Sequence, residues 1–592
     1  DVLIEGAVSA NSERTGGASR RAGAGGSVWI SCRTIRGAGI VRANGSMNTS
    51  NGNASLCGAG GCVAIHYDAA AQAELPVPDL RISAGVDFYS KTRGLSDVGT
   101  LYLTDSRFLR ETYNTQRGIG GGRLILGDWG DWTPASLSLD DVWLRFPSAV
   151  CRNWHLTGGI SVTGLSGRLD LGGETFFMVQ RNVTPLVSEE TVNVIVDGDV
   201  TLSDSGRLSV YAAVTNGLAE TWATLDVKGD LTLSSPDAYL ELGGVCPTNR
   251  IGSVTYFGGR KSVRLNVGGD LRVLSGARLD VRAAMTNGVE AFGAVVTVGG
   301  TLQIGDGAKV CPESDPCNLG SVAFDVGSLV VDEGGWLCAD RRGGAGGHEA
   351  SKLSTLLVKQ AEGEGPGYGV SVYALKYGTK TFNRTGAGGG YGGRGMFNEI
   401  QTGKDVSGRS YGDAGLPLLP GSGGGTRSDG WDRTGGHGGG LVYVTAKNAI
   451  TVNGKVSADG MESISSQSGA GSGGGICLRA ASFSAGATAV LTADGGAAYN
   501  GRQSGAGGGG RIAVHTSRPA PASGVVMKTV RSADRPTRSM QWIRVAADAT
   551  FSARGGTVTY AYEDDWPYGT SAEDGTVRFE EVHSAGIVFM VN

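Results

Sequence analysis

The chain has 592 residues, 102 of them glycine, with 18% charged and 40% hydrophobic residues and a formal net charge of −4. Because acidic and basic residues are nearly balanced and no long apolar run occurs, the composition excludes nucleic acid as an expected partner and predicts no membrane-spanning helix. Glycine is far above its usual share of about 7%, but short alternating apolar runs recur, which excludes collagen and predicts a folded chain.

Residues 1–125 are assigned to a glycine-rich repeat region that ends one tandem unit. Glycine-dense tracts alternate there with strand-like runs such as SVWIS at 27–31 and CVAIH at 62–66. Glycine lets two backbones approach closely and adopts positive φ at little cost, so we expect sharp corners or tightly stacked loops between strands. A flexible linker is the alternative interpretation of these tracts.

Residues 126–345 are expected to form β-solenoid repeats. Between 192 and 340, apolar and polar residues alternate on both sides of a turn glycine, which predicts half-buried strands joined by tight corners. We predict that the turn glycines occupy equivalent corners and that the valines before them stack inward, although a register error of one residue would turn the valines outward. The glycines are Gly198, Gly229, Gly269, Gly300 and Gly327, with Gly159 at an earlier corner, and the valines are Val196, Val227, Val267, Val298 and Val326.

Residues 346–520 form a second glycine-rich region, and residues 521–592 are assigned to the start of the next unit. The second region repeats the beginning of the chain: Gly6 aligns with Gly454 at an offset of 448, and His66 aligns with His515 at an offset of 449. Tandem repeats of this kind predict a stack in which each coil buries its apolar face on its neighbours. The expected fold class is all-β: a parallel β-solenoid, or β-helix, with glycine-rich stacked-strand regions.

The nine cysteines allow two interpretations. Cys57 and Cys62 bracket GAGG, and Cys311 and Cys317 bracket PESDP, spacings that suit small loop-closing disulfides of an exported protein. Buried free thiols acting as small apolar side chains fit the same positions. The absence of a CxxC pair disfavours a tetrahedral zinc site.

No catalytic, cofactor-binding or metal-binding residue is predicted, and we expect that the chain is not an enzyme and takes no cofactor. A polysaccharide-degrading β-helix needs clustered carboxylates, bound calcium or a basic residue on its lateral face. SVWIS is only faintly similar to the WIDH strand of pectate lyases, because Ser31 and Cys32 stand where the acidic residue and the histidine belong.

Several other residues fit a functional site, but a structural role explains each of them better. The carboxylates of DGD at 197–199 and GDWGD at 127–131 fit a metal or acid pair, but aspartate beside glycine is typical of a turn. His66 and His515 recur at one place of the repeat, which favours a structural position. Aromatic residues either line a sugar-binding face or fill coil ends, and they are Trp129, Trp132, Trp143, Trp154, Trp336, Tyr391 and Trp431.

Residues 1–125 and 385–592 share one order of motifs: a glycine-rich tract, a strand, G-x-V/I-x-A-D/N-G, a second glycine-rich tract and R-I-A-V-H, which reads C-V-A-I-H in the first region. This order resembles the glycine-rich repeat regions of very large secreted or cell-surface bacterial proteins. The resemblance implies an adhesin-like structural or adhesive segment outside the cell, in a fibre or coat, with no catalytic residues. Both ends break off inside strand-like runs, so we expect a fragment whose partners are further copies joined end to end, within or between chains, with surface polysaccharide as a second candidate partner. The alternative function is a polysaccharide-binding or polysaccharide-degrading parallel β-helix protein.

Overall fold

The computed structural model is almost entirely β, and its described residues fall into two compact units. Unit 1 comprises residues 1–177, 186–213 and 222–244, and unit 2 comprises residues 178–185, 214–221 and 245–592. The described residues are 1–12, 23–46, 58–85, 97–116, 118–172, 192–211, 214–215, 223–243, 248–251, 254–257, 259–260, 263–284, 286, 292–316, 318–347, 362–372, 375–377, 380–382, 385–396, 407–426, 434–463, 467–499, 504–517, 525–530, 542–558 and 571–584. Among them, no helix is long and apolar enough to cross a membrane.

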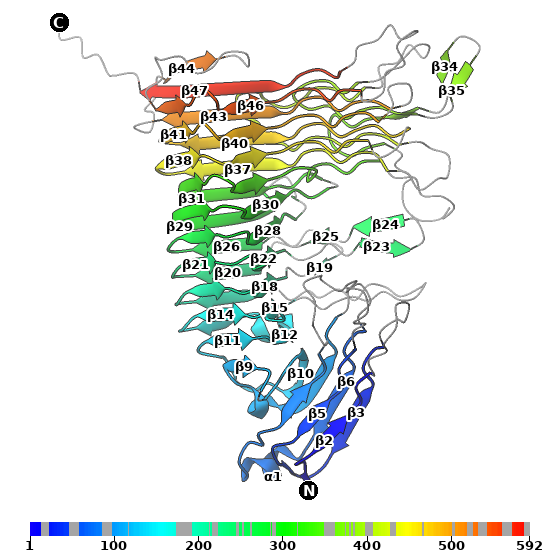
Figure 1. Ribbon diagram of the computed structural model, residues 1–592, viewed down its shortest axis with the longest axis vertical. Coiled ribbons are helices and arrows are strands. Elements are labelled where there is room, and N and C mark those ends of the chain that lie inside the picture. The colour runs from blue at the N-terminus through cyan, green and yellow to red at the C-terminus, as the bar shows by residue number, and fades with distance from the viewer. Residues whose placement is uncertain are drawn as a thin grey trace, which may run out of the picture. The chain divides into compact units, whose positions relative to one another are not determined.

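Unit 1 consists of stacked parallel strands (Figure 1). One ladder contains β3 (Ser27–Ser31), β6 (Cys62–His66), β8 (Thr100–Asp105), β10 (Gly122–Asp128), β12 (Trp143–Phe146), β15 (Arg168–Leu171), β18 (Arg207–Val210) and β22 (Tyr239–Leu242). A second ladder contains β9 (Thr112–Asn114), β11 (Leu137–Asp140), β14 (Ile160–Thr163), β17 (Val200–Leu202) and β21 (Leu231–Leu233). A third contains β13 (Trp154–Leu156), β16 (Asn193–Val196) and β20 (Ala223–Val227). In the first coils, β1 (Val2–Leu3) also pairs with β4 (Ile35–Arg36), and β5 (Ile40–Arg42) pairs with both β2 (Ala7–Ser9) and β7 (Arg81–Ser83). The short helices of unit 1 are α1 (Ala69–Ala73), η2 (Ser106–Phe108) and α2 (Ser148–Cys151).

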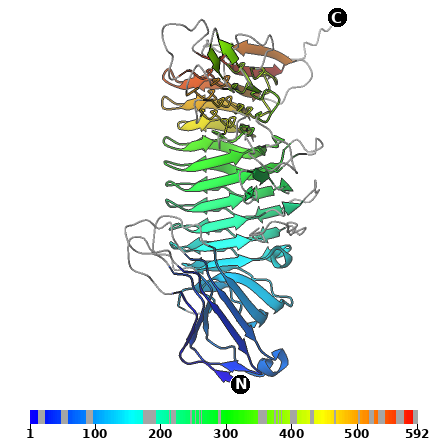
Figure 2. The same cartoon turned by 90° about the vertical axis from the view of Figure 1, so that its right-hand side faces the viewer.

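Unit 2 repeats this architecture, with strands stacked in parallel layers (Figure 2). Its first ladder contains β28 (Arg278–Arg282), β30 (Lys309–Glu313), β32 (Trp336–Cys338), β39 (Lys455–Ser457), β42 (Val490–Thr492) and β46 (Thr550–Ser552). The second contains β26 (Val263–Val267), β29 (Ala294–Ile304), β31 (Val322–Val331), β37 (Leu441–Ala446), β40 (Gly475–Ala480), β43 (Arg511–Ser517) and β47 (Thr576–Ser584). The third contains β27 (Leu271–Val273), the later halves of β29 and β31, β38 (Ala449–Val452), β41 (Ser482–Ala485) and β45 (Ile543–Val545).

A few antiparallel pairs flank the parallel ladders of unit 2. They are β44 (Val525–Val530) with β47, β19 (Val214–Thr215) with β25 (Gly259–Arg260), β23 (Thr248–Ile251) with β24 (Val254–Phe257), β33 (Ser371–Val372) with β36 (Thr385–Gly386), and β34 (Leu375–Tyr377) with β35 (Lys380–Phe382). Most of the strand pairing in both units is nevertheless parallel and between successive coils. The expected fold class, an all-β parallel solenoid with glycine-rich stacked regions, is therefore confirmed.

The predicted core valines point inward. Val196, Val227, Val267, Val298 and Val326 are each at most 2% exposed, and each buried Val or Leu side chain contributes about 1.5–3 kcal/mol to folding. The turn glycines also stack, since Gly300 donates to the carbonyl of Gly269.

Two details of the corner prediction differ in the structure. Gly198 donates to the carbonyl of Gly158, so Gly158 occupies the earlier corner and the assignment of Gly159 was wrong by one residue. The sequence HLTGGIS offers both glycines, and alternation alone does not choose between them. A bulge between β29 and β31 places Gly327 opposite two residues.

The glycine-rich tracts of unit 2 are packed, extended segments with a period of three. Successive N–H groups of residues 469–474 donate in turn to three neighbouring segments, and every third residue donates to the same segment. This is the pattern of an extended left-handed helix, which has three residues per turn. The donor–acceptor pairs are Gly469–Gly425 and Ser472–Ser422, Ala470–Gly505 and Gly473–Gly508, and Gly471–Met461 and Gly474–Ala458. Because neighbours surround such a segment on three sides, little space remains for side chains.

The two copies of the repeated sequence form the same strand pairs. β1 pairs with β4 as β38 pairs with β41, β2 pairs with β5 as β39 pairs with β42, and β3 pairs with β6 as β40 pairs with β43. The register agrees too: Val28 lies opposite Val63, and the aligned Ile476 lies opposite Ile512. The sequence repeat is therefore a repeat of structure.

Candidate functional site

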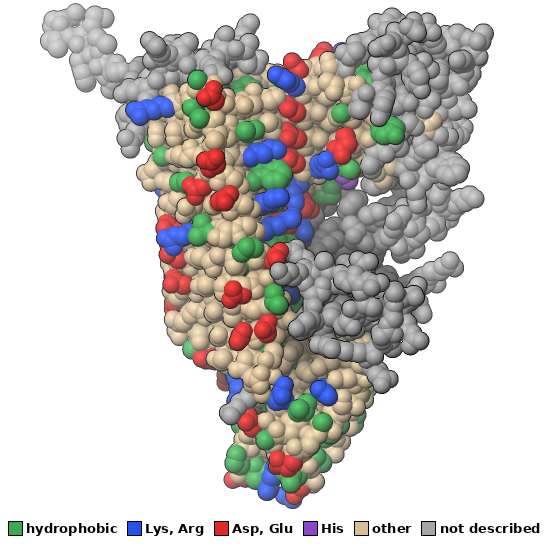
Figure 3. Space-filling model, in the orientation of Figure 1, with side chains coloured by type: hydrophobic (Ala, Val, Ile, Leu, Met, Phe, Trp, Pro, Cys, Tyr) green, Lys and Arg blue, Asp and Glu red, His purple; other side chains and the backbone are tan. Residues whose placement is uncertain are grey.

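The outer face of the first ladder of unit 2 concentrates ionisable and polar side chains. Alternate residues of these strands face away from the core and form three columns across the coils. One column contains Arg278, Lys309, Trp336 and Lys455; the middle column contains Asp280, Cys311, Cys338, Ser457 and Thr492; and the third contains Arg282, Glu313, Asp340, Asp459 and Asp494. Rows of basic and acidic side chains run along one face of the molecule in Figure 3.

The first column holds an aromatic ring between two cations. The Lys309 and Lys455 ammonium nitrogens lie 4.5 and 4.7 Å from the centroid of Trp336. Its indole Nε1 donates to Ser457 Oγ at 2.8 Å. Both lysines come from strands that flank β32, so the half-buried ring of Trp336 packs against a cation from each neighbouring coil.

The last three members of the third column, Asp340, Asp459 and Asp494, form an aspartate ladder. Asp459 accepts hydrogen bonds from the backbone N–H of Asp494 and the hydroxyl of Thr492, both at 2.8 Å. Burial, followed by the neighbouring carboxylate of Asp340, raises the pKa of Asp459 to about 6. The Lys455 Nζ atom lies 3.7 Å from both carboxylates and offsets part of their repulsion.

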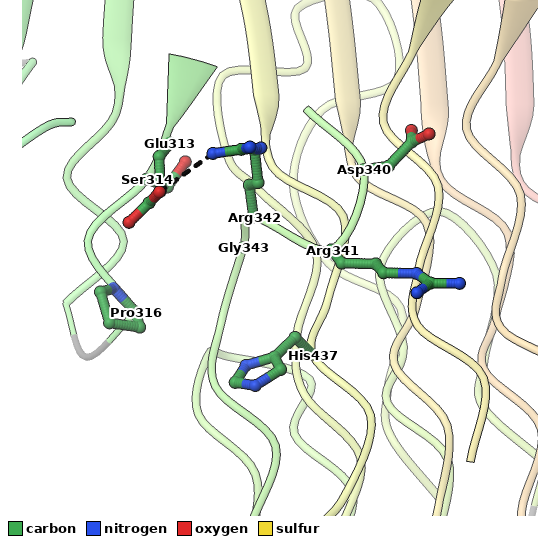
Figure 4. A pocket seen from close by; sticks show the side chains of 8 residues that line it. All are labelled: Glu313, Ser314, Pro316, Asp340, Arg341, Arg342, Gly343 and His437. Atoms are coloured by element: carbon green, nitrogen blue, oxygen red, sulfur yellow. Dashed lines mark hydrogen bonds and ion pairs between the residues drawn. The ribbon is translucent and has the colours of Figure 1, made fainter. Parts of the chain in front are cut away.

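A pocket of about 400 Å³ opens beside this column and is lined by Glu313, Ser314, Pro316, Asp340, Arg341, Arg342, Gly343 and His437 (Figure 4). Its charged groups have protein partners: Arg342 Nη1 lies 3.0 Å from Glu313, and Arg341 Nη2 lies 2.7 Å from Glu462. The His437 ring accepts a 3.4 Å hydrogen bond from the backbone of Gly346. Protein contacts therefore engage both arginines and the histidine that line the pocket.

Unit 1 carries a buried ionic network on the outer face of β12 and β15. Asp170 is fully buried and accepts from Trp143 Nε1 at 2.8 Å, Arg145 Nη2 at 3.2 Å and Arg168 Nε at 2.8 Å. Arg145 also binds Asp97 through two 3.0 Å contacts. Burial alone would raise the pKa of Asp170, but the guanidinium groups of Arg168 and Arg145 lower it. No sequence motif indicated this network.

The paired aspartates of GDWGD and DGD lie at turns. Asp128 accepts from the backbone N–H of Gly130 at 2.9 Å, which is a local aspartate turn. Asp199 accepts from the N–H of Asp230 at 2.8 Å, and Asp197 lies 2.9 Å from the exposed ring of His155. Within the described part of the chain, no group of three or more His, Cys, Asp or Glu residues is arranged to hold a metal ion.

The two aligned histidines have different surroundings. The ring of His66 is stacked between Trp29 and Tyr102, with centroids 4.3 and 4.4 Å away, and its Nε2 atom is buried without a hydrogen-bond partner. His515 Nδ1 lies 3.3 Å from Glu580, and burial lowers the pKa of His515. Both histidines lie on equivalent strands, but no common reactive partner accompanies them.

Most of the aromatic residues that could line a sugar-binding face pack on other side chains. Trp132 and Trp154 lie 6.0 and 4.9 Å from Phe146, centroid to centroid, and Trp129 joins them at 6.4 Å. Arg168 covers the ring of Trp143 at 4.3 Å, and the rings of Tyr391 and Tyr411 pack at a tilt with their centroids 4.8 Å apart. Trp431 lies outside the described residues.

Cys62 and Cys311 are free thiols, and the partners expected for them, Cys57 and Cys317, lie outside the described residues. Cys151 and Cys477 are buried free thiols, as the second interpretation expects. The sequence did not indicate the contact between the thiols of Cys311 and Cys338.

Comparisons of the chain with protein-family models, curated proteins and solved structures find no match.

Proposed function

We propose that this chain is a structural segment of an exported, repetitive β-solenoid protein, and that a further copy of the unit stacks on the coil formed by β1, β2 and β3. The glycine at position 6 carries the proposal. A Cβ atom at the aligned Gly454 would lie 2.3 Å from the carbonyl oxygens of Asp332 and Gly335 in the preceding coil, so that only glycine fits. A Cβ atom at Gly6 would meet nothing within 4 Å.

Gly6 therefore has no steric reason to be glycine in the isolated chain. Glycine also lowers stability, because it loses more backbone freedom on folding than any other residue. Residues 332–335 of the preceding coil lie against Gly454. A further coil that lies against Gly6 in the same way would explain why that position is glycine.

Apolar side chains of the first coil support the same proposal. Val8 is 38% exposed, whereas the aligned Val456 is fully buried. Trp29 is 72% exposed, whereas the aligned Cys477 is fully buried. Among the described residues, β1, β2 and β3 each pair along one edge only, which leaves N–H and C=O groups open to another strand.

The location outside the cell and the adhesive or coat-forming use rest on the resemblance of the glycine-rich motif. The structural role also fits an outer face whose ionisable groups bind one another. Stacking copies bury each coil on the next, so that a long assembly needs no new kind of contact. The copies join within one long chain or between chains.

A duplicated chain tests the stacking. Residues 1–448 are followed directly by residues 1–592, so that Asp1 of the second copy takes the place of Ala449. We expect electron microscopy to show one continuous particle, longer than the parent particle. Two particles joined by a flexible connection would contradict the proposal.

Gly6→Val in the second copy of the duplicated chain is the matched variant. The same substitution in the parent chain should not lower its melting temperature, because nothing lies within 4 Å of the added Cβ. In the duplicated chain it should separate the two copies. If the substituted duplicated chain still forms a continuous particle, the contact at Gly6 is not the one proposed.

An activity assay examines the alternative function. The parent chain should release neither reducing nor unsaturated sugars from a panel of polysaccharides. Release that is lost on substitution of Asp340 and Asp459 together would favour a polysaccharide-degrading enzyme over the structural role.

A further inference from the structure

Two cysteines lie side by side on neighbouring coils of unit 2. Lys309 of β30 lies opposite Trp336 of β32, and Val310 lies opposite Leu337, so the next residues in register are Cys311 and Cys338. Adjacent strands are about 4.7–4.9 Å apart, which falls within the Cα separation of about 4.4–6.8 Å found in disulfides. Both side chains belong to the outward middle column, so both extend from the same face of the sheet.

The surroundings of the pair differ from those of an ordinary buried thiol. Cys311 and Cys338 are 2% and 8% exposed, and their thiols share a hydrogen bond. That hydrogen bond lowers the pKa of Cys338 and raises the pKa of Cys311, and the nearby Arg342 guanidinium favours both thiolates. Cys338 is also the more exposed of the two, so a small oxidant reaches it first.

We infer that Cys311 and Cys338 form a disulfide that joins β30 to β32 when the protein meets a small-molecule disulfide. The thiolate of Cys338 attacks one sulfur of the oxidant and releases one thiolate of that molecule. Cys311 then loses its proton and attacks the Cys338 sulfur of the mixed disulfide, which releases the second thiolate. The two cysteines are oxidised by two electrons in total, and one molecule of oxidant is reduced to two thiols.

The structure thus gives Cys311 a different partner from the one that sequence spacing suggests. Cys317 is close in sequence, but Cys338 is next in register on the adjacent strand. The following position of the column is Ser457, opposite Cys338. A serine is therefore compatible with this column, so Cys→Ser variants are suitable for testing the pair without disturbing the fold. The inference is independent of the stacking of further copies.

Peptide mapping distinguishes the two partners. The full chain is purified in reductant, incubated folded with oxidised glutathione, alkylated in denaturant and digested with trypsin and a glutamate-specific protease. These enzymes separate the three cysteines onto the peptides 310–313, 314–333 and 334–341. We expect peptides 310–313 and 334–341 to be joined, with the loss of two hydrogen masses and without alkylation at either cysteine. Addition of reductant should release them.

A second arm refolds the reduced, denatured chain in a glutathione redox buffer, so that burial cannot hinder the oxidant. Cys311→Ser and Cys338→Ser should each abolish the joined peptide, whereas Cys317→Ser and Cys477→Ser should leave it. Linkage of Cys311 to Cys317, or alkylation of both Cys311 and Cys338 in both arms, would overturn the inference.

Discussion

The carboxylate of Asp340 accepts a 2.8 Å hydrogen bond from the backbone N–H of Asp459, 119 residues further along the chain. Asp459 makes the same contact with Asp494, and in unit 1 Asn11 accepts a 2.7 Å hydrogen bond from the N–H of Asn44. The Asp or Asn of the repeated motif therefore joins successive coils. Its side chain replaces a backbone acceptor where the strand ends.

Removing one carboxylate of this ladder should weaken the junction between coils. Asp459→Ala leaves the N–H of Asp494 and the hydroxyl of Thr492 without their acceptor, which should cost about 1–3 kcal/mol. Asp459→Asn keeps an acceptor oxygen, as Asn11 and Asn44 do, and should retain most of the stability. Hydrogen exchange of the peptide that contains Asp494 should accelerate in the alanine variant only. Equal exchange in both variants would show that the ladder does not hold the coils.

The raised pKa of Asp459 predicts a dependence of stability on pH. Its pKa rises from 3.8 to about 6, so the folded state binds the proton more tightly than the unfolded state. The resulting stabilisation is fully present below the ordinary pKa and is lost as pH rises through about 6, by about 3 kcal/mol in total. Denaturant unfolding of the parent chain and of Asp459→Asn should therefore diverge between about pH 4 and about pH 7, with the parent chain losing more stability. A constant difference between the two chains would contradict the prediction.

The buried network of unit 1 should be far more sensitive than an exposed ion pair. Asp170→Ala leaves the buried Arg145 short of a counter-charge, and loss of one partner of a buried pair costs about 3–5 kcal/mol. Asp197→Ala, which breaks the exposed contact with His155, should cost at most about 1 kcal/mol. Thermal melting of the two variants measures the contrast. Equal melting temperatures would mean that the network contributes little.

Glycines of the packed tracts should resist substitution even where their φ is ordinary. A Cβ atom at Gly473 would lie 2.0 Å from the carbonyl oxygen of Ala493, so Gly473→Ala should destabilise unit 2 by about 2 kcal/mol or more. At Gly85 the nearest atom would be 3.8 Å away, so Gly85→Ala should be tolerated. Limited proteolysis of the two variants compares them. Similar resistance to the protease would indicate that the tracts are loosely packed.

Local patterns predicted much of the fold. Alternation around turn glycines predicted the inward valines, because period 2 fixes which side chains share a face of a strand. The glycine pair at 158–159 exposed the limit of that pattern, since either residue can form the corner. The tandem alignment of Gly6 with Gly454 also predicted equivalent strands.

Contacts between coils were largely beyond sequence reasoning. Cys311 lies next to Cys338, and Asp340 lies next to Asp459, because strands of successive coils pair in register whatever number of residues separates them in sequence. Spacing therefore favoured the near neighbour Cys317. The network around Asp170 was missed for the same reason, since Asp97 is distant in sequence from the strands that carry Arg145 and Arg168.

Hydrogen exchange of the first coil tests the stacking most directly. In the duplicated chain, the first copy carries Val8→Ile as a mass label, so that peptides covering residues 1–10 of the two copies are distinguished. Stacking predicts that this peptide exchanges as fast in the first copy as in the parent chain, and more slowly in the second copy, where β2 gains a neighbour on its open edge. Equally fast exchange in both copies would contradict it.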